Sequence, residues 1–175
     1  MTTNDKDIIL TMREDAEHGF RLLMQSYKEP LYWHIRRLVV SHDDAQDAAQ
    51  EAFIRIFRSF RQYNEQNSLR AWIFRIATNE ALRLIERRRE DSMPIEMVFD
   101  IQADSYINYS DLEAVRLQKA ILSLPPKQQL AFNLRYYDEM DYEEIAQIAD
   151  TTAASVKASY HVAKEKIIKY MTNND

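Results

Sequence analysis

The chain has 175 residues, of which 46% are hydrophobic and 11% aromatic, so it can bury one large core or two smaller ones. With one Gly and four Pro it has too few turn residues for a many-stranded sheet, and we predict an all-α fold. The absence of cysteine excludes disulfides, thiolate nucleophiles and thiolate metal sites, and the net charge of -5 argues at first against a nucleic-acid partner.

No apolar run approaches the roughly 18 residues that a membrane span needs. The N-terminal segment also lacks the basic start and apolar core of a signal peptide. Together with the lack of cysteine, these features predict a cytoplasmic protein.

Helical periodicity predicts two small helical domains joined by a linker. We expect helices near residues 5–25, 28–40, 43–62, 68–90, 111–123, 127–137, 141–148 and 153–171. Residues 91–111 break the helical period, contain Pro94 and have no Lys or Arg, as is typical of an interdomain segment. The predicted divisions are therefore a first domain of residues 1–90, a linker of residues 91–111 and a second domain of residues 112–175.

Charge is distributed unevenly between these segments. Residues 58–90 have a net charge of +4, whereas the linker has a net charge of -5. The last predicted helix is cationic, because it contains four basic residues and one acidic residue, Glu165. The basic residues are Lys157, Lys164, Lys166 and Lys169. A positive surface can therefore exist on an acidic chain.

Residues 42–57 form an amphipathic helix with an alanine-rich apolar stripe. We expect its other side to consist of Asp44, Asp47, Gln50, Glu51 and Arg55. Paired acids could bind a metal or act in acid/base chemistry, but the helix has no His three residues from a Glu. A solvated charged face explains the pattern better.

Residues 59–90 combine a polar loop with a helix that carries basic and aromatic side chains. This combination suits single-stranded nucleic acid, because cations can bind phosphates, aromatic rings can stack on bases and amides can hydrogen-bond to base edges. The alternative is that Trp72 and Phe74 belong to the core and that the run Arg87, Arg88, Arg89 is a solvated helix end. Taken as a set, the residues favour nucleic acid.

Residues 141–169 have the pattern of a helix-turn-helix motif. Ile145, Ile148 and Ala149 form one apolar stripe, and Val156, Tyr160, Ala163 and Ile167 form another. Between the stripes, Asp150, Thr151 and Thr152 favour a turn whose oxygens cap the second helix. The second helix then presents Lys157, Ala158, His161 and Lys164 outward, as a helix in a DNA major groove does. The same pattern also fits an ordinary small helical domain.

Three blocks in this order resemble the extracytoplasmic-function sigma factors of bacterial RNA polymerase. Residues 44–57 are similar to region 2.2 of that family, residues 69–89 to regions 2.3 and 2.4, and residues 122–167 to region 4. The resemblance implies a region 2-like helical bundle and a region 4-like helix-turn-helix. It also implies that the chain binds core polymerase, recognises two promoter elements and helps to open the DNA.

Carried over to this sequence, the resemblance implies three sets of contacts. The clamp helices of the polymerase largest subunit would meet Asp44, Asp47, Gln50, Glu51 and Arg55. The minus-ten element would meet Tyr63, Asn67, Ser68, Leu69, Arg70, Arg75, Asn79 and Arg83. The minus-thirty-five element would meet Ser155, Lys157, Ala158, Ser159, His161, Val162 and Lys164, and the polymerase flap would meet the helices around Leu130 to Tyr137.

The chain departs from the family at the helix-turn-helix. It has Asp150 where members often carry Gly, and Ser159 and Val162 where they often carry Arg. Asp tolerates a left-handed backbone better than most residues, so we expect the turn to survive. Loss of cationic contacts should weaken duplex affinity and its salt dependence.

We therefore expect an initiation factor without catalytic residues, bound metal or cofactor. The family commonly has an anti-sigma partner, often in the membrane, and the sequence identifies none. One alternative is a helix-turn-helix regulator with an N-terminal sensing or dimerisation domain. Another is an enzyme of nucleic acid with a carboxylate-bound metal, which the missing ligand set disfavours.

Overall fold

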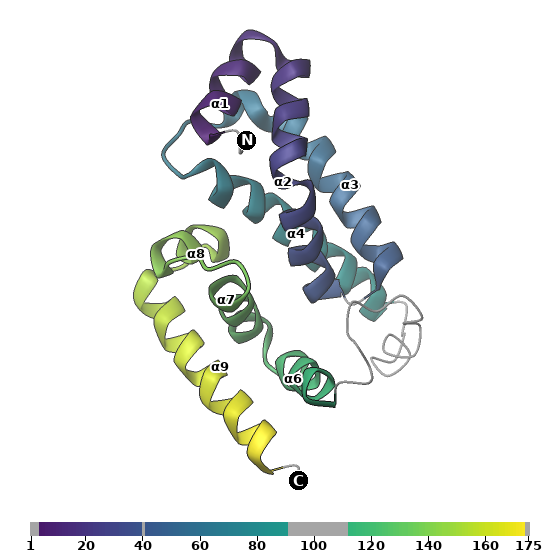
Figure 1. Cartoon of the computed structure of the whole chain (residues 1–175), viewed down its shortest axis with the longest axis vertical. Coiled ribbons are helices and arrows are strands. Elements are labelled where there is room, and N and C mark those ends of the chain that lie inside the picture. Colours follow the sequence, from purple (N-terminus) through teal and green to yellow (C-terminus); the bar gives the residue numbers. More distant parts are fainter. Residues whose placement is uncertain (1–3, 40, 91–111, 174–175) are drawn as a thin grey trace. The chain divides into compact units, whose positions relative to one another are not determined.

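The computed structural model describes residues 4–39, 41–90 and 112–173, and every regular element in these ranges is a helix (Figure 1). This confirms the predicted all-α fold. The chain separates into two compact units, one N-terminal and one C-terminal. The predicted linker, residues 91–111, lies outside the described residues. None of the described helices is long and apolar enough to cross a membrane.

The N-terminal unit is a bundle in which α2 contacts α1, α3 and α4, and α3 also packs along α4 (Figure 1). Its elements are α1 (Asp5–Glu14), α2 (Ala16–Val39), α3 (His42–Ser59), the 3-10 turn η1 (Phe60–Gln62) and α4 (Leu69–Glu90). The core consists of fully buried aliphatic residues such as Leu23, Leu31, Ile35, Ile56 and Ile73. Burial of each such side chain contributes about 1.5 to 3 kcal/mol of transfer free energy.

The first two predicted helices have the wrong boundary. We expected one helix to end near residue 25, but α1 ends at Glu14 and Asp15 adopts an extended backbone. The carboxylate of Asp15 accepts the backbone N–H of His18 at 3.2 Å and so caps the start of α2. Pro30 lies inside α2, which begins at Ala16 and not near residue 28 as we expected.

The crossing of α1 and α2 depends on the single glycine of the chain. A Cβ atom at Gly19 would lie 2.3 Å from the backbone nitrogen of Met12 and 2.4 Å from its Cα atom. Any side chain at this position would push α1 away from α2. At the other end of α1, the Tyr27 hydroxyl donates a hydrogen bond to Asp5 at 2.7 Å.

The alanine stripe predicted on α3 lies in the core. Ala45, Ala48 and Ala52 are at most 2% exposed, as are Ala77 and Ala81 on the neighbouring α4. Small side chains on both helices allow their backbones to approach closely. The stripe is therefore structural, which leaves the remaining face of α3 for other contacts.

The C-terminal unit consists of α6 (Leu112–Leu122), α7 (Pro126–Tyr136), α8 (Tyr142–Ala149) and α9 (Ala153–Asn173). The long α9 contacts each of the other three helices. The side chains of Ala120, Ile121, Phe132, Ala163 and Ile167 meet in its core. Pro126 occupies the first turn of α7, where its missing N–H costs no hydrogen bond.

Candidate nucleic-acid and polymerase interfaces

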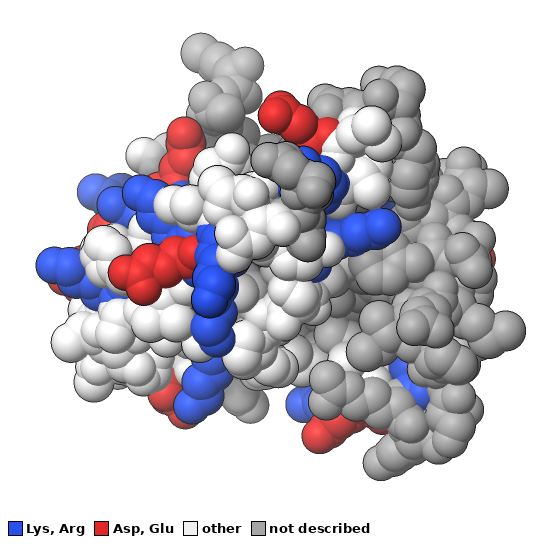
Figure 2. All heavy atoms as spheres, turned by 90° about the horizontal axis from the view of Figure 1, so that it is seen from below, with Lys and Arg blue, Asp and Glu red and all other residues white. Residues whose placement is uncertain are grey.

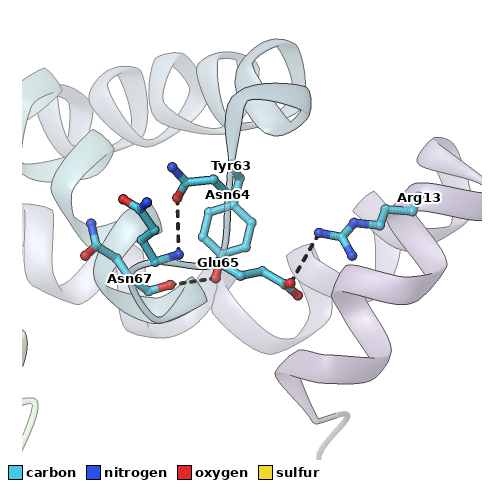
Figure 3. A network of polar contacts seen from close by, with 6 residues as sticks. Arg13, Tyr63, Asn64, Glu65 and Asn67 are labelled. Carbon is cyan, nitrogen blue, oxygen red and sulfur yellow. Dashed lines mark hydrogen bonds and ion pairs between the residues drawn. The ribbon is translucent and has the colours of Figure 1, made fainter.

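The loop between η1 and α4, residues 63–68, is held in shape by its own polar groups (Figure 3). The Tyr63 hydroxyl donates to the carbonyl oxygen of Asn67 at 2.7 Å, which closes the loop. The Asn64 side chain accepts the backbone N–H of Gln66 at 3.1 Å, and Glu65 has a left-handed backbone with φ of 61°. The loop is therefore ordered before any ligand binds.

Three aromatic rings form the base of this loop. The ring centre of Tyr63 lies 5.2 Å from that of Trp72 and 5.9 Å from that of Phe60. Tyr63 is 9% exposed, and burial, together with Glu65 and Asp5, raises the pKa of its hydroxyl. Tyr63 therefore remains a neutral donor that supports the loop from inside.

Two residues predicted to touch minus-ten DNA lie in the core instead of on the surface. These are Tyr63 and Leu69, and Leu69 is 2% exposed. A third, Ser68, is exposed but accepts the backbone N–H of Ala71 at 3.0 Å and so caps α4. The sequence pattern could not separate residues that shape the loop from residues that face solvent.

The remaining predicted minus-ten residues are accessible along α4 and the loop. Asn79 is exposed on α4, whereas Asn67, Arg70 and Arg75 are half-buried. The Arg83 side chain is 51% exposed and pairs with Glu80 at 2.7 Å. The structure thus leaves two amides and three guanidinium groups within reach of a ligand.

On α3, the predicted charged face divides into two parts. Asp47, Gln50 and Glu51 are exposed, as predicted. Asp44, however, is 7% exposed, and its carboxylate lies 2.5 Å from the guanidinium of Arg88 on α4. The prediction that Asp44 faces solvent is therefore wrong, because an ion pair with α4 draws it inward.

Arg55 is also directed at α4, where it pairs with the buried carboxylate of Glu80. Because Glu80 is 5% exposed and also pairs with Arg83, it joins a residue of α3 to the surface of α4. Arg55 remains half-exposed, so it can contribute to a surface while it stabilises the bundle.

An apolar groove between α2 and α3 lies beside the exposed charged residues of α3. It has a volume of about 1070 Å³, and Gln50 belongs to its lining. The aromatic rings of Phe20 and Phe57 meet in it at 5.1 Å, and Ile54 and Phe57 are 41% and 46% exposed. Exposed apolar side chains that gather in one groove are typical of a protein-binding site. Sequence analysis missed it, although Ile54 and Phe57 lie one turn apart outside the alanine stripe.

The helix-turn-helix of the C-terminal unit has the predicted local structure. Asp141 caps α8 by accepting the backbone N–H of Glu144 at 2.8 Å. Asp150 adopts the left-handed conformation, with φ of 55°, and Thr152 caps α9 by accepting the N–H of Ser155 at 3.1 Å. The predicted burial of Val156, at 2% exposed, is confirmed.

The outward face of α9 also agrees with the predicted pattern. Six of the seven residues expected to face minus-thirty-five DNA are exposed, and Ser159 is half-buried. Figure 2 shows one side of the molecule, on which basic and acidic side chains are interspersed among the described residues.

The segment expected to meet the polymerase flap is mostly core. Leu130, Ala131, Phe132, Asn133 and Leu134 are buried. Tyr136, by contrast, is 55% exposed and stacks on Phe132 with ring centres 5.2 Å apart. The accessible part of this segment is thus its C-terminal end. Within the described ranges, no group of three or more His, Cys, Asp or Glu residues could hold a metal ion.

Comparison with protein-family models gives two matches that lie on the two compact units. Residues 23–90 match Sigma-70 region 2, and residues 114–167 match Sigma-70 region 4. The chain belongs to the sigma-70 family. Its relatives place it in the extracytoplasmic-function group, as the resemblance in the sequence implied, and it is a factor of transcription initiation.

Two relatives of this sigma factor match along nearly their whole length. The extracytoplasmic-function sigma factor SigW of Bacillus subtilis is 26% identical, over 95% of this chain and 96% of the relative. The sigma-E factor of Escherichia coli K12 is also 26% identical, over 93% of this chain and 92% of the relative. The alternative of a helix-turn-helix regulator with an N-terminal sensing or dimerisation domain is not favoured, because the N-terminal unit matches Sigma-70 region 2.

Solved structures share the fold. CnrH, in complex with the cytosolic domain of CnrY, superposes with a TM-score of 0.77 at 16% identity and covers 98% of this chain and 99% of its own. The sigma factor RpoE of Bartonella quintana, in complex with the anti-sigma factor NepR, has a TM-score of 0.71 at 20% identity, over 89% of this chain and 98% of its own.

Proposed function

We propose that this sigma factor directs core RNA polymerase to promoters by reading single-stranded minus-ten DNA with residues 63–68 and α4, and duplex minus-thirty-five DNA with α9. The observation that carries the proposal is the ordered loop inside the region 2 match, with accessible amides on the loop and on α4. It supplies binding groups only, and polymerase supplies the chemistry. The proposal also places the protein in the cytoplasm, where it meets its promoter DNA.

At the minus-ten element, the proposed contacts are those that remain accessible. Asn67 and Asn79 have amides that can read the edges of unstacked bases, and Arg70, Arg75 and Arg83 would hold phosphates. Trp72 is half-buried next to Tyr63, so its outer surface offers a ring on which a base can stack. Tyr63, Ser68 and Leu69 support this surface without contacting DNA.

At the minus-thirty-five element, we propose that the first turns of α9 enter the major groove. Lys157, Ala158, His161 and Val162 would face base edges, and Ser155, Ser159 and Lys164 would lie nearer the phosphates. The left-handed turn at Asp150 and the cap at Thr152 fix the angle at which α9 leaves α8. They therefore fix which side chains reach the DNA.

For the polymerase, we propose that the groove between α2 and α3 receives a helix of the enzyme. The groove supplies apolar area through Phe20, Ile54 and Phe57, and Asp47 and Glu51 supply negative charge beside it. An amphipathic helix with a basic edge matches both properties. An exposed Tyr136 on α7 is the corresponding candidate for the flap.

A test of the groove uses the double variant Ile54→Ser and Phe57→Ser. We expect it to lose co-purification with core polymerase and to keep its helical spectrum, because both side chains are exposed. Leu112→Ser is the matched control, since Leu112 is 74% exposed on α6, outside the groove. Equal retention of the double variant and the control would contradict the groove assignment.

We also propose that an anti-sigma protein covers the polymerase-binding surfaces. The structural relatives RpoE and CnrH were solved with NepR and with the cytosolic domain of CnrY. A partner that occupies the apolar groove would exclude polymerase by direct competition. Two measurements would test this: displacement of core polymerase from the wild-type protein by a co-expressed partner, and loss of partner co-purification in the Ile54 and Phe57 double variant.

The function as a whole is tested by run-off transcription. Purified protein and core polymerase are incubated with fragments of the host genome, and transcripts are mapped at their 5′ ends. We expect discrete starts that require both components and that share two upstream sequence elements. If the protein adds no start to those of core polymerase alone, the proposed function is wrong.

A further inference from the structure

A single ion pair joins the 63–68 loop to α1, outside the segment that matches region 2. The guanidinium of Arg13, in the last turn of α1, lies 3.5 Å from the carboxylate of Glu65 (Figure 3). The region 2 match begins at residue 23, so α1 is not part of it. The pair therefore ties the candidate DNA-reading loop to an element whose role the family match does not describe.

The loop's own geometry aims Glu65 at α1. Glu65 has a left-handed backbone, with φ of 61°. In Figure 3, Glu65 points toward Arg13, whereas the amides of Asn64 and Asn67 lie on the side away from α1. Holding the carboxylate on one side thus presents the amides on the other.

Glu65 is also the only acidic residue of the loop. An unneutralised carboxylate would repel the phosphates of a DNA strand that approaches the amides. Arg13 offsets this charge and holds it away from the reading side. Because both side chains are about half-exposed, at 50% and 51%, the pair adds little to the stability of the fold.

We propose that Arg13 is a positioning residue for promoter recognition, acting through Glu65 to hold the 63–68 loop in the conformation that reads unstacked bases. The inference rests on the proposed function of that loop. It makes α1 a determinant of promoter selectivity, although Arg13 itself need not touch a base. The contact would act on single-stranded or forked DNA, because only there are the base edges exposed.

The test measures binding of holoenzyme, formed with core polymerase, to a forked minus-ten probe and to closed duplex. We expect Arg13→Ala to lower affinity for the forked probe about fivefold, which is near the upper limit for an exposed ion pair. Affinity for closed duplex and the urea midpoint of unfolding should not change. Lys6→Ala is the matched control, since it removes another exposed cation from α1.

Variants at Glu65 distinguish positioning from a direct phosphate contact. If the ion pair positions the loop, Arg13→Ala, Glu65→Ala and the double variant should lose similar affinity, and the swap R13E with E65R should restore most of it. The differences in affinity between probes that carry each of the four bases at the position read by the loop should become smaller in Arg13→Ala and return in the swap. Additive losses, or a swap that binds no better than R13E alone, would overturn the proposal.

Failure of the proposed function has a different signature. If wild-type holoenzyme does not prefer the forked probe, or if Asn67→Ala and Asn79→Ala leave its binding unchanged, the loop does not read DNA. If those variants lose affinity but Arg13→Ala does not, the loop reads DNA and only the role of Arg13 is wrong.

Discussion

The carboxylate of Asp44, in the first turn of α3, lies 2.5 Å from the guanidinium of Arg88, near the end of α4. The Asp44 side chain is 10% exposed, so the pair is shielded on one side from solvent. It closes one end of the α3 and α4 pair, and Arg55 with Glu80 joins the same two helices further along. This relationship assigns Asp44 to the stability of the bundle and not to its surface.

We predict that Asp44→Asn lowers the free energy of unfolding by about 1 to 3 kcal/mol, because it leaves Arg88 without its charged neighbour on α3. Urea unfolding followed by circular dichroism measures this change. Asp47→Asn, on the exposed side of the same helix, should change stability by less than about 0.5 kcal/mol. Equal effects of the two substitutions would contradict the assignment.

The second prediction concerns the exposed acids of α3. Reversing the charge of Asp47 and Glu51 to Lys should weaken binding to core polymerase by about 2 to 5 kcal/mol if both groups become desolvated in the complex. The fold should remain intact, because both side chains are exposed on an alanine-backed helix. Co-purification with core polymerase provides the measurement, and unchanged retention would show that polymerase binds elsewhere.

The third prediction distinguishes residues that contact DNA bases from residues that hold the 63–68 loop in shape. Asn79→Ala together with Asn67→Ala should weaken binding to forked minus-ten DNA and leave stability unchanged, because the Tyr63 contact uses only the backbone carbonyl of Asn67. Ser68→Ala should instead lower stability by about 1 kcal/mol, since it removes the cap of α4. If the double variant binds forked DNA normally but fails on closed duplex, the loop is wrongly assigned.

The fourth prediction concerns α9. Lys157→Ala should cost about 1 to 3 kcal/mol in a sequence-dependent way if Lys157 reads a guanine edge. If Lys157 contacts phosphate, affinity should fall equally on all duplexes and the salt slope should drop by about one unit. Titrations at several salt concentrations on cognate and scrambled duplexes distinguish these results. Lys169→Ala, near the C-terminal end of α9, is the control. If Lys157→Ala has no effect on either duplex, α9 does not recognise the DNA.

The fifth prediction is a pH dependence of stability. Burial, with a smaller contribution from Arg37, lowers the pKa of His34 to about 3. The ring lies against Phe74, and its Nε2 atom is 2.8 Å from the hydroxyl of Thr78. Since Thr78 donates to the carbonyl oxygen of Phe74, the neutral ring donates through Nε2.

The pKa of His34 is lower in the folded state than in the unfolded state. The stability that neutral His34 gives the fold is therefore fully present above the unfolded pKa of about 6.5 and is lost as the pH falls toward 3. The free energy of unfolding should therefore fall by up to about 1.4 kcal/mol per pH unit below pH 6 from this residue. His34→Gln should show a shallower decline in urea titrations between pH 7 and pH 4. Parallel pH profiles for the two proteins would contradict the prediction.

Patterns within one helix were sufficient to predict much of this fold. The alanine stripe of α3, the apolar stripes of α8 and α9, and the cap at Thr152 all depend on residues close in sequence. The break at Asp15 was missed because apolar residues recur at helical spacing on both sides of it. The close approach of α1 and α2 at Gly19 follows this break and depends on contacts between the two helices, which periodicity within one helix does not report.

The candidate sites could be predicted only where they depend on one element. Asp44 appears solvent-facing on α3 alone, and its burial arises from Arg88, which is distant in sequence. Tyr63 and Leu69 lie in a polar stretch, yet the rings of Phe60 and Trp72 and the core enclose them. The groove with Phe20 and Ile54 exists only when α2 and α3 lie side by side.

Gly19 has a consequence for how promoter choice can drift between related proteins. Because Gly19 has no side chain, α1 can pack directly against α2. The position of α1 on α2 in turn determines the distance between Arg13 and Glu65. A methyl group at Gly19 would lift α1 and lengthen that reach without altering any residue that faces DNA or polymerase. If Arg13 positions the loop as proposed, promoter preference can therefore change through a position that contacts neither DNA nor polymerase.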